Sequence, residues 1–299
     1  MRITNNAVFH QVTADINSAA TRLFERQRQV ASSRRLATAS DDPVGAGMAV
    51  SLRESLAQLL QAQRNGDRAE ARLETSQGVL TNILSILEEV KSLAFRGVDS
   101  TYSSSDRQNL ATQINQRLEQ LLSDANTRSL DGYIFGGTQT DVAPFTRNPG
   151  PGDITSVAAG GIAGQVNAEL HGALKVVANV PGSTVFTATS PDIFSLLITI
   201  RDALKAGNVP GAQDLANLDA AVDQVRVVSA DVGSRISRIQ DIQARSQNDL
   251  LTLRGRLSKI EDTDVAEAAV EFQQAQNVYQ AALAAASKVS QLNLLNFLQ

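Results

Sequence analysis

The sequence contains no cysteine and no tryptophan, and only 4% of its 299 residues are aromatic. Without cysteine the chain can form no disulfide bond, thiolate metal site or thiolate nucleophile, so its stability must come from packing. The apolar 42% is mostly Leu, Ala, Val and Ile, a composition that suits long packed helices better than a compact pocket for a small molecule.

Strong charge and long apolar runs are also missing. A net charge of -4 provides no basic field that would hold nucleic acid, so we expect no nucleic-acid partner. No run of about 18 apolar residues occurs, so we expect no membrane insertion. The first residues lack the charged and apolar regions of a cleaved signal peptide, which predicts that the chain is cytoplasmic or leaves the cell by a specialised route.

The clearest pattern in the chain is a heptad repeat over residues 44–94. Apolar or small residues alternate in steps of three and four, a spacing typical of a coiled-coil seam. The repeat consists of Leu52, Ser55, Leu59, Ala62, Gly66, Ala69, Leu73, Ser76, Leu80, Ile83, Leu87, Val90 and Ala94. The small residues in its first half would let another helix approach closely.

A second and more regular repeat covers residues 215–260. Its members are Leu215, Leu218, Val222, Val225, Ser229, Val232, Ile236, Ile239, Gln243, Ser246, Leu250, Leu253, Leu257 and Ile260. At 1.5 Å per residue this predicts a helix of roughly 70 Å. A shorter helix is expected over 106–125, after a serine loop that can cap it, and should fold back against the long helix before it.

Glycine and proline cluster between residues 131 and 192, around short pieces rich in Val, Thr and Phe. Such punctuation predicts a small β-rich insertion. We therefore expect a mainly α fold: an elongated antiparallel helical bundle or coiled coil formed by the N- and C-terminal segments, with a small β-rich inserted domain. The expected divisions are 1–40 with 265–299 as a terminal helical assembly domain, 41–137 with 193–264 as a long coiled-coil rod domain, and 138–192 as the inserted outer domain.

Residues suited to catalysis or metal binding are few. His10 and His171 have no partner at a metal-ligand spacing, and no phosphate-binding loop or serine nucleophile motif is present. The adjacent carboxylates Asp41 and Asp42 fit a helix cap before Pro43 better than an acid–base pair. We predict no catalytic residue, no metal site and no cofactor, and thus no enzyme.

Both chain ends read as amphipathic helices with sparse, alanine-rich faces. Arginines near the first helix, such as Arg22 and Arg26, could suggest a nucleic-acid or membrane surface, but acidic residues at Asp264, Glu267 and Glu271 can complement them. Such ends bury little area, so they would gain stability by packing against copies of themselves. The predicted assembly interface comprises Val12, Ile16, Leu23, Val30, Phe272, Tyr279, Leu283, Leu292, Leu295 and Phe297.

The chain contains the motif RLATASDDPV at Arg35–Val44, ahead of the first long helix. With the motifs that follow, it resembles the flagellin superfamily, and within it the hook-associated proteins that join the flagellar hook to the filament; this match is the most specific. LDGYIFGGT and NVPG are similar to the entry and exit of the β domain. The other matching segments are MRITN at Met1–Asn5, LSKIEDTD at Leu257–Asp264 and LNLLNFL at Leu292–Leu298.

The resemblance implies a structural adaptor of the bacterial flagellum. It further implies export without a cleaved signal peptide, an export chaperone, and self-association outside the cell into a ring or short helical layer. The neighbours would be the first hook-associated protein on one side and flagellin or the filament cap on the other. Alternatives are flagellin itself, a cytoplasmic coiled-coil scaffold, and an enzyme that uses the β insertion.

Overall fold

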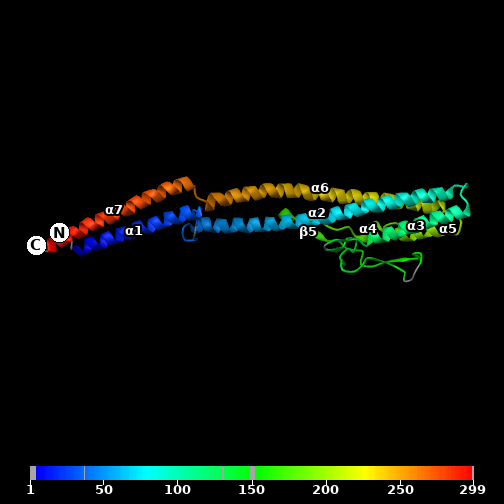
Figure 1. Ribbon diagram of the computed structural model, residues 1–299, viewed down its shortest axis with the longest axis horizontal. Helices are drawn as coiled ribbons and strands as arrows, with labels where there is room; N and C mark the ends of the chain where they lie inside the picture. The colour runs from blue at the N-terminus through cyan, green and yellow to red at the C-terminus, as the bar shows by residue number, and fades with distance from the viewer. Residues whose placement is uncertain (1–4, 37, 130, 149–151, 298–299) are drawn as a thin grey trace. The chain divides into compact units, whose positions relative to one another are not determined.

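The computed structural model is mainly helical (Figure 1) and describes residues 5–36, 38–129, 131–148 and 152–297. Met1 to Thr4 of the opening motif and Leu298 of the closing one lie outside the described residues. The helices are α1 (Asn5–Ser32), α2 (Pro43–Val98), α3 (Ser104–Ala125), η1 (His171–Ala173), α4 (Gly182–Val185), α5 (Ile193–Lys205), α6 (Ala212–Glu261) and α7 (Val265–Phe297). The strands are β1 (Arg128–Ser129), β2 (Gly132–Tyr133), β3 (Phe145–Arg147), β4 (Val157–Ala159), β5 (Asn167–Glu169) and β6 (Lys175–Val177). The expected mainly α fold with a small β insertion is confirmed.

The chain forms two compact units. The larger unit comprises residues 59–247, and the smaller unit comprises residues 1–58 and 248–299. These limits fall inside α2 and α6, whereas the sequence pattern suggested divisions near residues 40 and 264. The three functional domains named above stay a prediction.

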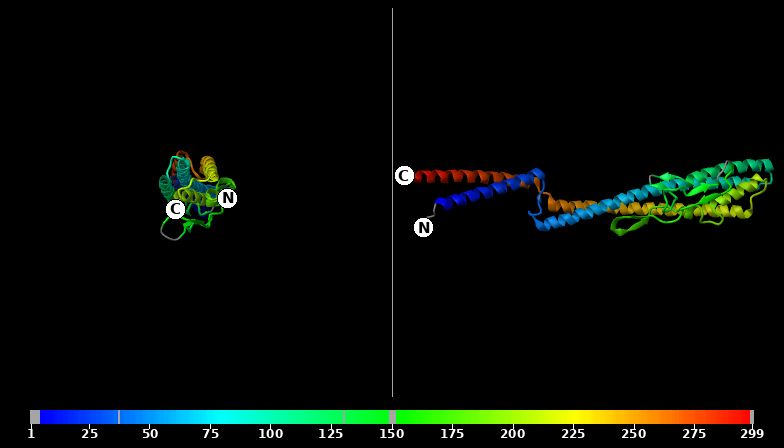
Figure 2. Two further views of the ribbon diagram at one scale, coloured as in Figure 1. Left: turned by 90° about the vertical axis from the view of Figure 1, so that its right-hand side faces the viewer. Right: turned by 90° about the horizontal axis from the view of Figure 1, so that it is seen from below.

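In the larger unit, α2 and α6 pack antiparallel along the two heptad repeats (Figure 2). Ion pairs cross between the helices, with Lys91 Nζ 2.5 Å from Asp219 Oδ1 and Arg226 Nη2 2.7 Å from Glu88 Oε1. Most seam side chains of this unit are fully or almost fully buried, as expected for knobs that fill holes on the partner helix. They include Leu73, Ser76, Leu80, Ile83, Leu87 and Val90 of α2, and Leu218, Val222, Val225, Val232 and Ile239 of α6.

Polar and small seam positions have specific partners. Gln77 Nε2 donates to Ser229 Oγ at 2.7 Å, and Gln243 Nε2 donates to Asp67 Oδ1 at 2.8 Å. A Cβ at Gly66 would lie 3.3 Å from the Gln243 side chain and 3.4 Å from the side chain of Leu170. The close approach expected at this position is therefore made by side chains of α6 and of the β insertion.

α3 begins and ends close to the residues expected from the sequence. Ser103 Oγ accepts from the Asp106 N–H at 3.2 Å, while Asp106 Oδ2 accepts from the Ser103 N–H at 3.0 Å. This reciprocal capping box satisfies two backbone donors at the helix start. α3 folds back on α2, where Arg117 Nε lies 2.5 Å from Glu89 Oε2.

The sequence pattern missed α5. Asp192 caps this helix by accepting from the Ser195 N–H at 3.0 Å, and the helix buries one face against α3. Its buried residues are Ile193, Phe194, Leu196, Leu197, Ile200, Arg201 and Leu204.

The β insertion consists of three two-stranded antiparallel pairs, β1·β2, β3·β4 and β5·β6. Phenylalanine rings anchor it to α5: Phe186 lies 4.7 Å from Phe145 and 5.4 Å from Phe194, measured between ring centroids. Phe135 packs on the same ring at 5.2 Å. These buried rings supply the apolar contacts that strands of two or three residues cannot provide alone.

The GGT and NVPG motifs meet inside this insertion. Gly137 has a φ of +53°, and a Cβ there would lie 2.0 Å from the Ala163 carbonyl oxygen, so only glycine fits. The buried Asn179 amide donates to Gly137 O at 3.2 Å and to Gly164 O at 3.0 Å, and its Oδ1 accepts from the Val166 N–H at 2.8 Å. The amide group therefore ties the entry and exit segments together.

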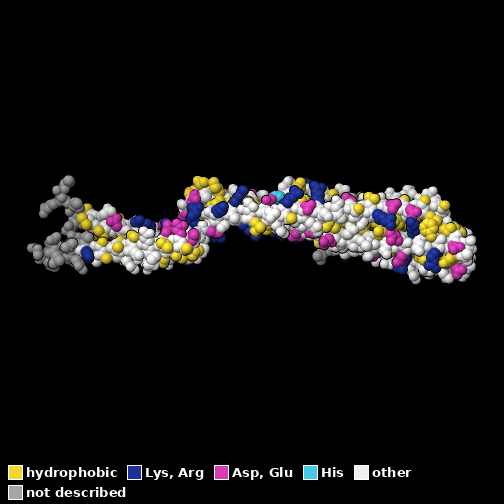
Figure 3. Space-filling view, turned by 90° about the horizontal axis from the view of Figure 1, so that it is seen from above, with side chains coloured by type: hydrophobic (Ala, Val, Ile, Leu, Met, Phe, Trp, Pro, Cys, Tyr) yellow, Lys and Arg dark blue, Asp and Glu magenta, His cyan; other side chains and the backbone are white. Residues whose placement is uncertain are grey.

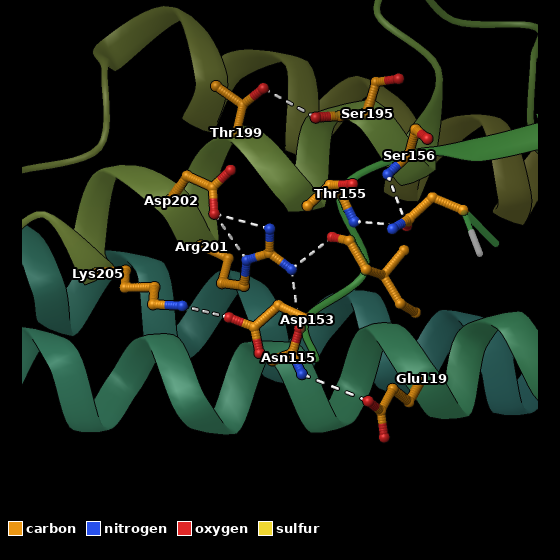
Figure 4. A network of polar contacts seen from close by, with 12 residues as sticks. Asn115, Glu119, Asp153, Thr155, Ser156, Ser195, Thr199, Arg201, Asp202 and Lys205 are labelled. Carbon is orange, nitrogen blue, oxygen red and sulfur yellow. Dashed lines mark hydrogen bonds and ion pairs between the residues drawn. The ribbon is translucent and has the colours of Figure 1, made fainter. Parts of the chain in front are cut away.

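A second polar network holds the loop before β4 (Figure 4). Arg201 of α5 is only 2% exposed, and its Nη1 donates to Asn115 Oδ1 of α3 at 2.8 Å and to Ile154 O at 2.7 Å. Its Nη2 lies 2.7 Å from Asp202 Oδ1. Lys205 pairs with Asp153 next to it. The hydrogen bond from Lys205 is the main reason that the pKa of Asp153 lies below its ordinary value; burial opposes this shift, and the charges of Lys205 and Arg201 add to it.

Candidate assembly interface

In the smaller unit, α1 and α7 run side by side and antiparallel (Figures 1 and 2). Arg26 Nη1 lies 2.9 Å from Glu271 Oε2, so the expected charge complementarity between the chain ends is found at this pair. Each helix begins or ends at a polar linker, and Asp264 caps α7 by accepting from the Ala266 N–H at 2.8 Å. Helices α1 and α7 thus form one antiparallel pair, which is called the helical hairpin below although its helices are far apart in the sequence.

Most residues of the predicted assembly interface line the seam within this pair. Val12, Ile16, Leu23 and Val30 of α1 are half-buried, as are Phe272 and Tyr279 of α7. Leu283 remains 43% exposed. Leu292, Leu295 and Phe297 lie in the last turns of α7, where side chains are outside the described part of the structure. A role of these residues between copies stays a prediction.

The α1–α7 pair and the adjoining helix ends contain very little buried apolar surface. Among the described residues of the smaller unit, the only buried hydrophobic side chains are Ala19, Ala49, Leu250 and Ala268. Three of these four are alanines, and burying a side chain of one methyl group contributes little. Every other buried hydrophobic residue described lies in the larger unit. The described part of the paired ends therefore lacks a core of its own.

Large apolar side chains are instead exposed on this pair. Phe9 is 59% exposed and Phe24 is 67% exposed on α1, and Val270 and Val278 are open on α7. Figure 3 shows hydrophobic side chains at the surface over the α1–α7 hairpin. From Phe272 to Ser287, α7 carries no charged residue at all. Exposed apolar side chains that gather on one surface are typical of sites that bind another protein.

Phe9 and Phe24 are not among the predicted interface residues. Phe24 lies outside the three-and-four spacing of the α1 seam, so a search for periodic positions passes over it, whereas Phe9 lies three residues before Val12, within that spacing, and is nevertheless exposed. Their signal was compositional: the chain has only nine phenylalanines, and two stand on the outer faces of a helix.

A groove on one side of the pair has a different character. It is lined by Ala19, Arg22, Glu25, Arg26, Glu271, Gln274, Ala275 and Val278. Small residues form part of its lining and charged residues surround them. The hairpin therefore offers both exposed aromatic side chains and a shallow polar groove to a partner.

The described residues show no arrangement suited to metal binding or membrane crossing. No group of His, Asp and Glu among them could hold a metal ion, and none of the described helices is long and apolar enough to span a bilayer. His10 is exposed on α1, and His171 lies in η1 beside Gly172, whose φ is +69°.

Comparison with known proteins points to one group. The family model for the bacterial flagellin N-terminal helical region matches residues 3–140, and that for the flagellin C-terminal helical region matches residues 215–298. Flagellar hook-associated protein 3 of Escherichia coli is 24% identical over 282 residues, covering 88% of this chain and 89% of its own length. A flagellar filament core protein of Treponema maltophilum is 23% identical, covering 86% and 84%.

Solved structures show the same fold. The flagellar hook-associated protein 3 of Legionella pneumophila aligns with a TM-score of 0.63 at 16% identity, covering 70% of this chain and 98% of that one. A flagellar hook-associated protein of Vibrio parahaemolyticus also aligns with a TM-score of 0.63, at 15% identity, covering 74% and 100%. With both terminal helical regions matched over most of its length, the chain belongs to the flagellin family of structural flagellar proteins.

Proposed function

We propose that this chain is the adaptor subunit that joins the flagellar hook to the filament, and that it polymerises through its paired terminal helices. The observation that carries the proposal is the contrast between the two units. The larger unit has a complete core, while the α1–α7 pair exposes Phe9 and Phe24 and buries chiefly alanines. A surface of this kind is stabilised when copies pack together.

The role is structural rather than catalytic. The relatives that match most of the chain in length include hook-associated proteins, and their names support a place at the junction. The partners we propose are copies of this chain, the first hook-associated protein, flagellin, the filament cap and an export chaperone. Its place would be the flagellum outside the cell, reached without a cleaved signal peptide.

A filament subunit is the second candidate. It is favoured by the Treponema filament protein, which matches 86% of this chain. Flagellins of Salmonella match only 44% of it. The two candidates predict different phenotypes. Loss of a junction subunit prevents attachment of the filament, whereas loss of a filament subunit removes the protein of which the filament is built.

The deciding experiment is deletion of the gene, with motility, hooks and shed flagellin measured. Intact hooks together with flagellin released into the medium would establish the junction role, provided that the wild-type gene restores attachment. Loss of the filament protein itself would establish the filament candidate. Unchanged filaments would contradict both.

A further inference from the structure

The two linkers that precede and follow the long helices pair with each other in the smaller unit. Thr263 N–H donates to Ser33 O at 3.2 Å, and Arg34 and Asp262 form an antiparallel bridge. Ser33 has a φ of +54°, which turns the chain sharply at the end of α1. α1 and α7 are thus joined through their backbones at one end of the hairpin, in addition to their helix seam.

Arg35 connects the ends of the long helices at this point. Its backbone N–H donates to Glu261 O at 2.7 Å and its Nη2 donates to Ile260 O at 2.8 Å, so it satisfies carbonyls at the C-terminus of α6. A cation is favourable at that negative end of the helix. Its Nη2 also lies 3.5 Å from Asp42 Oδ2. Asp42 in turn caps α2 by accepting from the Gly45 N–H at 2.9 Å.

Glu261 is the unusual member of this set. The residue is only 6% exposed, and it is the last residue of α6, where the helix dipole disfavours a negative charge. Arg53 of α2 compensates for this, with Nη2 2.7 Å from Glu261 Oε1. A nearly buried carboxylate that depends on one arginine makes the arrangement sensitive to the loss of either partner.

We propose that Arg35, Arg53 and Glu261 are positioning residues for self-assembly: they hold the two linkers together as one joint, which keeps α1 and α7 side by side at this end until a neighbouring copy completes their packing. The inference rests on the proposed function, since it specifies how the assembly surface is kept in place. None of the three residues belongs to the exposed apolar surface of the hairpin.

The test uses the full-length chain with Glu261→Gln, which keeps the shape and removes the charge. Amide exchange of Leu36 and Thr263 should become at least tenfold faster, and the concentration needed for self-assembly should rise at least tenfold, while helix content stays constant. The exchanged pair Arg53→Glu with Glu261→Arg should recover most of both losses. Arg226→Gln, which breaks the exposed 2.7 Å pair with Glu88, is the matched control and should change neither measurement.

Three outcomes would overturn the inference. These are wild-type exchange and assembly in Glu261→Gln, faster linker exchange with unchanged assembly, or no recovery in the charge-exchanged variant. Failure of the wild-type chain to assemble under any condition would instead contradict the proposed function, and the exchange rates would still decide whether the joint exists.

Discussion

Replacing Asn179 by alanine should destabilise the larger unit without altering the helical hairpin. The side chain is fully buried and holds three backbone groups: the Val166 N–H, Gly137 O and Gly164 O. The variant leaves Val166 and the buried Gly137 without their partner, while the exposed Gly164 can bind water instead. At about 1–3 kcal/mol for each buried group left unsatisfied, the free energy of unfolding should fall by about 3 kcal/mol.

Urea unfolding followed by circular dichroism measures this loss. With a slope of about 3 kcal/mol per molar urea, the midpoint should fall by about 1 M while the slope stays constant. Asn179→Asp should be at least as harmful, because its second carboxylate oxygen would face the carbonyls of Gly137 and Gly164. Asn208→Ala, at an exposed loop position, is the control and should stay within about 0.5 kcal/mol. A loss below 1 kcal/mol in Asn179→Ala would refute the reasoning.

Three further predictions follow from other contacts. Phe24→Asp should abolish self-assembly, measured by sedimentation, and should leave the unfolding midpoint of the monomer unchanged because the ring is 67% exposed. Thr21→Asp, at another exposed position of α1, is the control and should assemble normally. Arg201→Met should cost about 3 kcal/mol in urea unfolding, since it removes the donor to a buried backbone carbonyl, and the idea fails if the loss is below 1 kcal/mol. The pKa of Asp153 is lowered by Lys205, so the pair should stabilise the folded loop fully above the ordinary carboxyl pKa of about 3.9. This stabilisation should be lost as the pH falls through the lower pKa of the folded state. Amide exchange in the loop between pH 2 and 6 should show the loss, and Lys205→Gln should remove the pH dependence.

The long helices could be predicted from the sequence because their signal is repeated many times. Each turn of α2 and α6 adds another apolar residue in the same phase, so isolated polar positions such as Ser229 do not hide the pattern. Helix starts were also readable, because Ser103 and Asp42 have the side chains that cap free N–H groups.

The interior of the β insertion could not be predicted in the same way. Strands of two or three residues provide too few alternations to reveal a period, and their pairing depends on distant contacts such as the Phe145–Phe186 stack. α5 was missed for a related reason: its apolar residues gather on one face, but its 13 residues repeat that pattern over only a few turns. The glycine and asparagine motifs can be recognised in the sequence, but their contacts cannot. Only the folded structure shows that Gly137 leaves room for the Ala163 carbonyl, and that the Asn179 amide donates to the carbonyl of Gly137.

The residues predicted for the assembly interface lie partly on the inner side of the α1–α7 pair. A periodic apolar stripe identifies the face that packs, and in α1 that face is occupied by α7 of the same chain, as the half-buried Ile16 and Leu23 show. A surface for a second copy has no such period, because the neighbour touches whichever side chains remain outside. The exposed Phe9 and Phe24 are therefore the more informative positions for mutagenesis.

The uneven distribution of core between the two units bears directly on assembly. Ala19 and Ala268 are well buried, but each contributes little to the stability of the hairpin. Fully burying an exposed ring such as Phe24 between copies would contribute about 1–2 kcal/mol per copy. Contacts of that size between copies add to the stability of the hairpin only when neighbours are present, so its order should depend on protein concentration. Hydrogen exchange of residues 7–32 in dilute and in assembled protein measures this dependence. Strong protection of α1 in the dilute monomer would show that the hairpin needs no neighbour, and would remove the physical reason for placing the assembly surface there.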